Sequence, residues 1–355
     1  MTPVPLELPL RPADAGELAN LIFDHAEGKP LTEDTRNRLA SRAGALKLET
    51  VKPYFGSLER DPVHPSAYYL AVDGTAADGT VTGQLLYLAL ANAPTGSIYR
   101  KTLLIGRMRR HNGPECVINT TPFGPQDCAN VETFAERINK AFLPQPQGAR
   151  PTITVEEDFP AAFTLFRALQ RRTGKNFAAL SGDYHAGVWA AVRAGWRQGY
   201  TLAADVDAET TGEALREAAG FSRYSCTLGT GDAGIKAAEA LHEQLRQARA
   251  AVRKGGGFDF ELRALEPLSS DGLREVVEAL KAGAHPPQLV DAGVVDAAQL
   301  EELAQAARQL QVTLSFRYGG ESPAAIEAMG RATAGRWNYR VRSVAEAETV
   351  SECLL

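Results

Sequence analysis

From Pro151 onward the chain alternates short β-type segments with amphipathic helical segments. The β-type segments are apolar and rich in β-branched or aromatic residues, whereas residues 300–310 repeat apolar side chains at helical spacing. Strands that alternate with helices need crossover connections and therefore form parallel sheets. Because eight such units close a (β/α)8 barrel, the pattern predicts a TIM-type barrel over residues 146–355. The predicted strands are Thr152–Glu156, Asn176–Ser181, Tyr200–Asp205, Arg223–Leu228, Phe258–Leu262, Gln288–Ala292, Val312–Arg317 and Trp337–Val341.

The segment Leu143–Pro151 separates this repeating part from a different pattern upstream. It contains three prolines and a glycine with few apolar residues, which is typical of a linker or an extended entry into a strand. Upstream, the pattern predicts a small α+β domain over residues 1–145, with Asp14 and Thr32 as helix N-caps. Its predicted helices are Pro12–Glu27, Thr32–Ala45 and Asn130–Ala141, and its predicted strands are Ala67–Val72, Thr82–Leu90, Tyr99–Gly106 and Glu115–Asn119.

Composition narrows the class of protein. The 355 residues are 44% hydrophobic and 23% charged, as in ordinary globular proteins, and the net charge of −5 argues against broad nucleic-acid binding. No apolar run is long enough for a signal peptide or a membrane span. The four cysteines show no CxxC spacing, which favours reduced thiols and a cytoplasmic location.

Polar residues follow most of the predicted strands, and in a parallel barrel these positions meet at one mouth. They include Asp207, Glu261, Glu266, Arg317 and Arg340. Active sites of TIM barrels are built at this end, so the sequence predicts a site for a small polar substrate, with neither nucleic acid nor membrane as partner. The alternative is that many of these residues only cap the helices that follow.

Individual residues suggest particular roles. His185 can act as a general acid or base, since an imidazole titrates near neutral pH, although a lone loop histidine is more often solvated. Arg317 with Gly319 and Gly320 can hold a carboxylate or phosphate, and the alternative is a helix entry that needs a flexible backbone. Glu261 can point into the barrel as a base or ligand, or form an interior ion pair with Arg340 or Arg317.

Four short motifs resemble the tagaturonate/fructuronate epimerases of bacterial uronate metabolism. They lie between about Lys175 and the C-terminus, and the first 145 residues show no such resemblance. The motifs are the run from Trp189 through Gly195-Trp196 to Asp205-Val206-Asp207, the strand Phe258-Asp259-Phe260-Glu261 followed by Glu266, the segment Ser315–Glu321, and the run Ala332–Arg340. The resemblance implies a barrel enzyme that acts on a sugar acid with help from a divalent metal.

This sequence departs from the family where the resemblance would place histidine ligands. Ala208 and Arg317 stand at the two histidine positions, and Ser322 stands at a lysine position. Of the family's residues, Asp207, Glu261 and Glu266 persist. Together with His185 they are the candidate catalytic residues, and Asp207, Glu266 and His185 are the candidate metal ligands. The candidate substrate-binding residues are Arg317, Gly319, Gly320, Glu321 and Arg340. Two hypotheses follow: a sugar-acid or sugar-phosphate epimerase or isomerase, with or without a metal, and a catalytically inactive barrel that binds a ligand or a partner.

Overall fold

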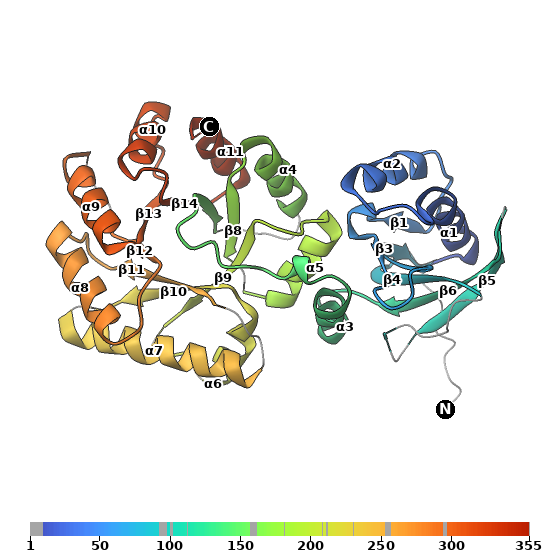
Figure 1. The fold of residues 1–355 in the computed structure, drawn as a ribbon, viewed down its shortest axis with the longest axis horizontal. Helices are drawn as coiled ribbons and strands as arrows, with labels where there is room; N and C mark the ends of the chain where they lie inside the picture. The colour runs from blue at the N-terminus through green and yellow to red at the C-terminus, as the bar shows by residue number, and fades with distance from the viewer. Residues whose placement is uncertain are drawn as a thin grey trace. The chain divides into compact units, whose positions relative to one another are not determined.

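The structure is a computed structural model that divides the chain into two compact units. It describes residues 10–91, 98–99, 102–111, 113–156, 162–180, 182–207, 209–210, 212–229, 231–252, 257–293 and 297–354. One unit comprises Met1–Leu143 together with Val188–Arg197, and the other comprises Pro144–Gly187 with Gln198–Leu355 (Figure 1). The predicted boundary lay between residues 145 and 146; the units divide between 143 and 144, with one later segment joining the first unit.

The first unit is built on a six-stranded antiparallel sheet in the order β1-β3-β4-β6-β5, with β2 paired to β3. The predicted α+β class is therefore confirmed, although sequence analysis missed the short strands β1 and β2. The strands are β1 (Val51–Pro53), β2 (Glu59–Arg60), β3 (Ala67–Thr75), β4 (Val81–Leu90), β5 (Leu103–Arg109) and β6 (Glu115–Pro122).

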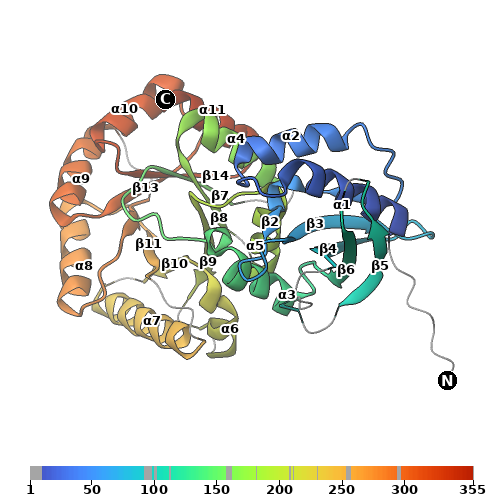
Figure 2. The same cartoon turned by 45° about the vertical axis from the view of Figure 1, so that its right-hand side comes forward.

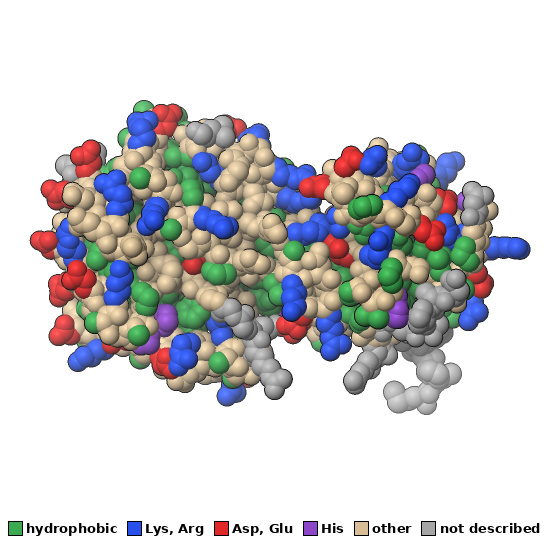
Figure 3. All heavy atoms as spheres, viewed as in Figure 1, with side chains coloured by type: hydrophobic (Ala, Val, Ile, Leu, Met, Phe, Trp, Pro, Cys, Tyr) green, Lys and Arg blue, Asp and Glu red, His purple; other side chains and the backbone are tan. Residues whose placement is uncertain are grey.

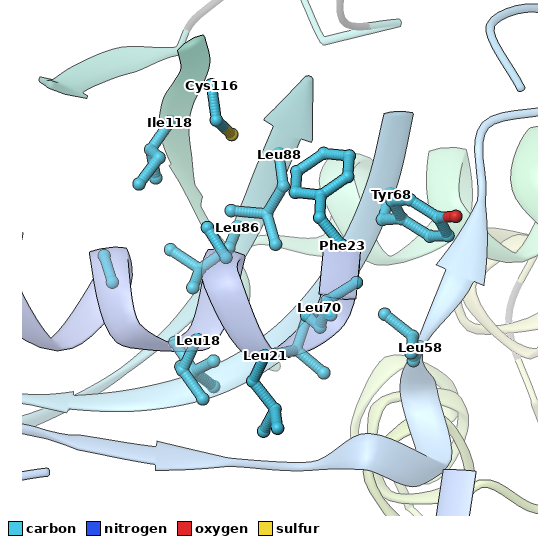
Figure 4. Close-up of a cluster of buried hydrophobic side chains, with 14 of the residues drawn as sticks. Leu18, Leu21, Phe23, Leu58, Tyr68, Leu70, Leu86, Leu88, Cys116 and Ile118 are labelled. Atoms are coloured by element: carbon cyan, nitrogen blue, oxygen red, sulfur yellow. The ribbon is translucent and has the colours of Figure 1, made fainter. Parts of the chain in front are cut away.

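Two helices, α1 (Pro12–Ala26) and α2 (Glu33–Ala43), belong to the core of this unit. Leu18 and Phe23 of α1 lie with Leu70 and Leu88 of the sheet in one buried apolar cluster (Figure 4). Thr32 caps α2 as predicted. The prediction for Asp14 was wrong: Pro12 starts α1 earlier, Arg11 is the N-cap, and the Asp14 carboxylate instead accepts hydrogen bonds from the backbone of Glu49 and Thr50.

The helix predicted over residues 130–141 is divided into three pieces. They are α3 (Cys128–Thr133), the π-helical turn η2 (Phe134–Ile138) and the 3-10 turn η3 (Lys140–Phe142). Asn139 separates the last two, because its side chain accepts a hydrogen bond from the Ala141 amide. This arrangement lets Phe134 contact both Phe123 and Phe142.

The second unit is a closed barrel of eight parallel strands, which confirms the predicted fold class. Each predicted strand overlaps an observed one, and Figure 2 shows helices placed around the strands. The strands are β7 (Thr152–Val155), β8 (Asn176–Leu180), β9 (Tyr200–Val206), β10 (Arg223–Leu228), β11 (Asp259–Ala264), β12 (Leu289–Asp291), β13 (Thr313–Arg317) and β14 (Trp337–Val341).

Helices follow the strands in the order expected of this fold. Ser269 caps α8, and α11 forms in the short stretch that remains after the last strand. None of the helices in the described ranges is long and apolar enough to cross a membrane. The helices are α4 (Phe163–Thr173), α5 (Tyr184–Ala194), α6 (Gly212–Glu217) with the turn η5 (Ala218–Gly220), α7 (Gly231–Ala251), α8 (Ser270–Ala282), α9 (Ala297–Leu310), α10 (Pro323–Ala332) and α11 (Val344–Cys353).

Candidate functional site

Alternate residues of the barrel strands point into an interior that is unusually polar. Ser225 and Glu261 are register partners on β10 and β11, and Ser315 and Asn338 are partners on β13 and β14. Glu261 accepts hydrogen bonds from Ser225 at 2.5 Å and from Ser315 at 2.7 Å. Because β11 and β13 are not neighbours in the barrel, this contact crosses the interior. Side chains alternate between the inside and the outside along each strand, so the inward-facing residues that follow these positions lie closer to the mouth.

Glu261 lies at the centre of a buried charge network. Its carboxylate is 3.6 Å from the Arg340 guanidinium, and neither side chain is more than 1% exposed. Burial alone would raise the pKa of Glu261, but the charges of Arg340 and Arg223 and the hydrogen bonds from the two serines outweigh it and hold the pKa below its usual value. Of the two roles suggested for Glu261, these contacts are those of an interior ion pair with Arg340.

Arg340 links this interior to the mouth. Its Nε donates to Glu156 Oε1 at 2.7 Å, and the Glu156 side chain is 21% exposed. Arg340 was predicted to bind substrate directly. It is instead buried between Glu156 and Glu261, where it fixes the position of the first carboxylate.

A pocket of about 420 Å³ opens at the carboxyl ends of β11 to β14. Two arginines that line it, Arg317 and Arg342, are exposed, and their guanidinium groups make no ion pair or hydrogen bond within the part of the chain that the structure describes. A third arginine, Arg263, is paired with Asp205 at 3.2 Å. Unpaired guanidinium groups in a pocket are suited to bind a carboxylate or phosphate, because their geometry matches two acceptor oxygens.

Asp291 supplies a buried carboxyl group to the same pocket. It ends β12, is only 5% exposed, and accepts a hydrogen bond from the Gly293 amide at 3.0 Å. Burial raises the pKa of Asp291, and the charge of Glu261 adds to this rise, while Arg340 and Arg317 oppose it. Asp291 lies near the end of the predicted strand Gln288–Ala292 but was not among the predicted site residues; its signal in the sequence is a carboxylate that directly follows the apolar run Leu289-Val290.

The other predicted substrate-binding residues lie in the loop after β13. Gly319 and Glu321 line the pocket with Arg317, whereas Gly320 does not. The Gly319 amide already donates to Glu321 Oε2 at 2.9 Å, so it is not free to hold an anion as predicted. Ser322 caps α10, which is the alternative that sequence analysis left open for polar residues at strand ends.

The structure does not gather the three residues predicted as metal ligands. Asp207 is exposed and closes a local turn by accepting hydrogen bonds from the Glu209 amide and the Thr210 hydroxyl. Glu266 lines a different pocket, of about 240 Å³, beside α7 and α8. His185 is in the first turn of α5, next to the capping residue Asp183. Among the residues that the structure describes, no three His, Cys, Asp or Glu side chains are arranged to hold a metal ion. Ala208 lies outside them.

This chain resembles known proteins in structure rather than in sequence. No family model matches the sequence, and no curated protein matches it. Solved structures do match. The glycerol-complexed fructuronate-tagaturonate epimerase UxaE from Cohnella laeviribosi aligns over 87% of this chain and 74% of its own, with a TM-score of 0.56 and 16% identity. The native form of that enzyme aligns over 89% and 76%, with a TM-score of 0.56 and 15% identity.

The chain is similar in fold to this epimerase. The resemblance suggested by the sequence motifs is therefore confirmed as a structural match. It extends further than predicted, because coverage of 87% is more than the barrel alone can supply. At this identity the match to the epimerase establishes the fold, and the chemistry has to be argued from the pocket itself.

Proposed function

We propose that this chain is an epimerase or isomerase that acts on a sugar acid or sugar phosphate in the pocket above β11 to β14. The observation that carries the proposal is that two guanidinium groups without an ion-pair partner among the described residues, those of Arg317 and Arg342, line one pocket with the buried carboxyl of Asp291. The first two bind an anion, and the third moves a proton beside it. The fold of the epimerase from Cohnella laeviribosi supports the choice of a sugar-acid substrate.

Arg317 is the residue proposed to hold the anionic group of the substrate. An arginine that merely replaced a structural histidine would be ion-paired, and Arg317 makes no such pair with Glu261, Glu266 or Glu321. It lies opposite Arg340 in the register of β13 and β14, at the pocket end of the strand. Because Arg317 is exposed, water solvates its guanidinium group when no ligand is bound, and a desolvation cost arises only when an anion binds.

Asp291 takes the acid–base role that sequence analysis gave to His185, Asp207 and Glu266. A carboxyl group whose pKa is raised by burial accepts and returns a proton more readily near neutral pH than an exposed one. As a base, Asp291 would take a proton from a carbon next to a carbonyl group, and the electron pair would move onto the carbonyl oxygen. Delivery of a proton from water to the other face of that carbon, with return of the electron pair from oxygen, gives the epimer. Return of the proton from Asp291 to the former carbonyl carbon, with transfer of the neighbouring hydroxyl proton to the enolate oxygen, gives the isomer.

A divalent metal has no place in this proposal. The resemblance implies one, but the residues that would hold it, Asp207, Glu266 and His185, do not form a ligand set in this structure. The pocket itself combines one buried carboxyl with several arginines, and such a cationic lining repels a metal ion.

The proposal is tested by ligand binding and by hydrogen exchange on the substrate. Tagaturonate, fructuronate and hexose phosphates are titrated into the protein by calorimetry, and exchange at carbon is followed by NMR in deuterated water. We expect Arg317→Gln to weaken binding by about 1.5–3 kcal/mol, because a charge-assisted hydrogen bond is lost. Arg331→Gln is the control, since Arg331 is an exposed arginine of α10 outside this pocket.

The outcomes separate the two hypotheses. Binding that depends on Arg317, together with exchange that depends on Asp291, supports the enzyme. Binding without exchange in any of these compounds supports the inactive barrel. Equal binding by the wild type and Arg317→Gln would contradict the proposed site.

A further inference from the structure

Two histidines face each other on the second unit, at the end of the barrel opposite the proposed site. His242 lies on α7, and His285 lies in the turn between α8 and β12. Both are partly exposed, and histidine side chains are visible at the surface in the region of α7 and α8 (Figure 3). His285 precedes β12, and the ring of His242 contacts Phe258, which precedes β11. Both positions belong to the amino-terminal end of the strands, away from Asp291 and Arg317.

The two imidazole rings are close and well fixed. Their Nδ1 atoms are 3.0 Å apart, with ring centroids at 4.9 Å and an angle of 59° between the planes. His242 is held against Phe258 and Phe260, each with its ring centroid 5.0 Å away. His285 is held by its backbone, because its amide donates to the Leu280 carbonyl at 2.8 Å.

We propose that His242 and His285 form a binding site for one transition-metal ion of the zinc class, with Nδ1 of each ring as ligand. Zinc–nitrogen bonds are about 2.0–2.1 Å long. Two such bonds at angles between about 90° and 110° place their nitrogen atoms about 3 Å apart, which matches the observed separation. Imidazole is a preferred ligand for zinc, nickel and copper ions.

The remaining coordination positions belong to water or to a nearby carboxylate. Within the described ranges no third His, Cys, Asp or Glu already completes a ligand group. Glu239 lies one helical turn before His242 and so shares its face of α7. A Cβ added at Gly283 would meet both the Glu239 carboxylate, at 2.4 Å, and the His285 ring, at 3.4 Å, so these two side chains pack against the same glycine. Rotation of the Glu239 side chain would bring a third ligand.

Metal binding replaces the hydrogen bond between the rings. In the metal-free pair one Nδ1 carries the hydrogen and donates it to the other. That ring must shift its hydrogen to Nε2 before both Nδ1 atoms can bind a metal. The bound ion would then link α7 to the turn before β12. Since an ion that binds only the folded state stabilises it, the link would raise the unfolding temperature.

The test uses protein without a histidine tag. Zn²⁺ is titrated by calorimetry, Co²⁺ is followed by its visible absorption, and thermal unfolding is measured with and without Zn²⁺. We expect one ion per chain, and a loss of affinity of tenfold or more in both His242→Ala and His285→Gln. His111→Ala is the control, because His111 is an exposed histidine of the first unit.

Each outcome bears on the proposal. If the wild type binds no ion below millimolar Zn²⁺, or if both histidine variants bind as tightly as the wild type, the pair is only a hydrogen bond and the proposal is wrong. His242 packs on aromatic rings, so His242→Ala can lose stability for that reason alone. His285→Gln, in the exposed turn, then decides the question on its own.

Discussion

At the scale of single residues, Glu261 controls the charge balance of the barrel interior. Two guanidinium groups, those of Arg223 and Arg340, are fully buried there, and several of their nitrogen atoms have no hydrogen-bond partner within the described residues. Arg340 pairs with Glu156 and Arg223 lies 3.9 Å from Asp259, and the charge of Glu261 acts on both arginines. A neutral side chain at position 261 would leave each of these buried cations with one carboxylate fewer, in a medium that solvates them poorly.

We therefore expect Glu261→Gln to lower the free energy of unfolding by about 3–5 kcal/mol, which is the usual effect of removing one partner from a buried ion pair. Chemical denaturation at neutral pH measures the change. Because the pKa of Glu261 is held below its unfolded value, this stabilisation is present at neutral pH and is lost as the pH falls through the folded pKa. Glu266→Gln is the matched control, since Glu266 is exposed. A loss as small as in that control would contradict the network.

For Asp291, the stability of the fold depends on pH in the opposite direction. Its folded pKa is raised by burial, so Asp291 destabilises the fold progressively as the pH rises from its unfolded pKa to its folded pKa. We expect Asp291→Asn to raise the unfolding temperature at pH 7 while it removes hydrogen exchange on the substrate. Differential scanning calorimetry at pH 4 and pH 7 should show a gain that is larger at pH 7, because pH 4 lies near the ordinary pKa of an aspartate, where the destabilisation is only beginning. A variant that loses stability at both values would show that the carboxylate is structural.

At the scale of elements, three consecutive barrel helices end in the same strained way. The residues after α8, α9 and α10 include Ala284, Gln311 and Ala334, which have φ values of 65°, 59° and 50°. Residues with a Cβ seldom adopt this left-handed conformation, and it costs roughly 1–2 kcal/mol relative to the right-handed one. Glycine is the residue usually found at such helix ends, as Gly174 is after α4.

Ala334→Gly should therefore stabilise the barrel by up to about 1 kcal/mol, because the relief of strain exceeds the extra freedom that glycine has in the unfolded chain. Gly174→Ala is the reciprocal variant: a Cβ there would meet no atom within 4 Å, so its cost is conformational alone. Urea unfolding of both variants should give changes of opposite sign. Equal signs would mean that the helix ends are not under conformational strain.

The elements also show what sequence can and cannot predict. The strand Arg223–Leu228 was predicted to the residue, because Gly220 precedes it and apolar residues alternate along it. The piece around Phe134 was not, because a π-helical turn depends on where an aromatic ring finds its partners.

The site, too, could be predicted from the sequence only in part. Arg317 could be found from its strand end, whereas the importance of Asp291 depends on burial by β11 and β13, which sequence spacing does not reveal.

At the scale of the whole molecule, one segment lies within the barrel repeat in the sequence but packs with the first unit. Val188–Arg197 is part of the second βα repeat of the barrel by sequence, but it packs within the first unit. Arg193 is placed 4.1 Å from the ring centroids of both Tyr54 and Trp189, and its guanidinium group pairs with Asp73 at 2.7 Å. Gly195, with φ at +68°, comes so close to Gly56 that neither position has room for a Cβ.

We expect Arg193→Met to weaken the first unit, since Asp73 would lose its ion pair with Arg193 and the Tyr54 ring would lose the guanidinium group that lies over it. The free energy of unfolding of that unit should fall by about 1–3 kcal/mol. Hydrogen–deuterium exchange should become faster in β1 and β3, with β11 to β14 as an internal control. Faster exchange confined to the barrel strands would contradict this assignment.

The shared segment also has a consequence for how such a protein can change over evolution. A gene fragment that ends at the proline-rich linker would encode Asp73, Gly56 and Glu59 without Arg193, Gly195 and Arg197, which they contact. Recombination at the linker would therefore separate the first unit from residues 188–197, which complete its packing. Duplication, exchange or loss of either part is constrained by the other, so the two parts are expected to be inherited together.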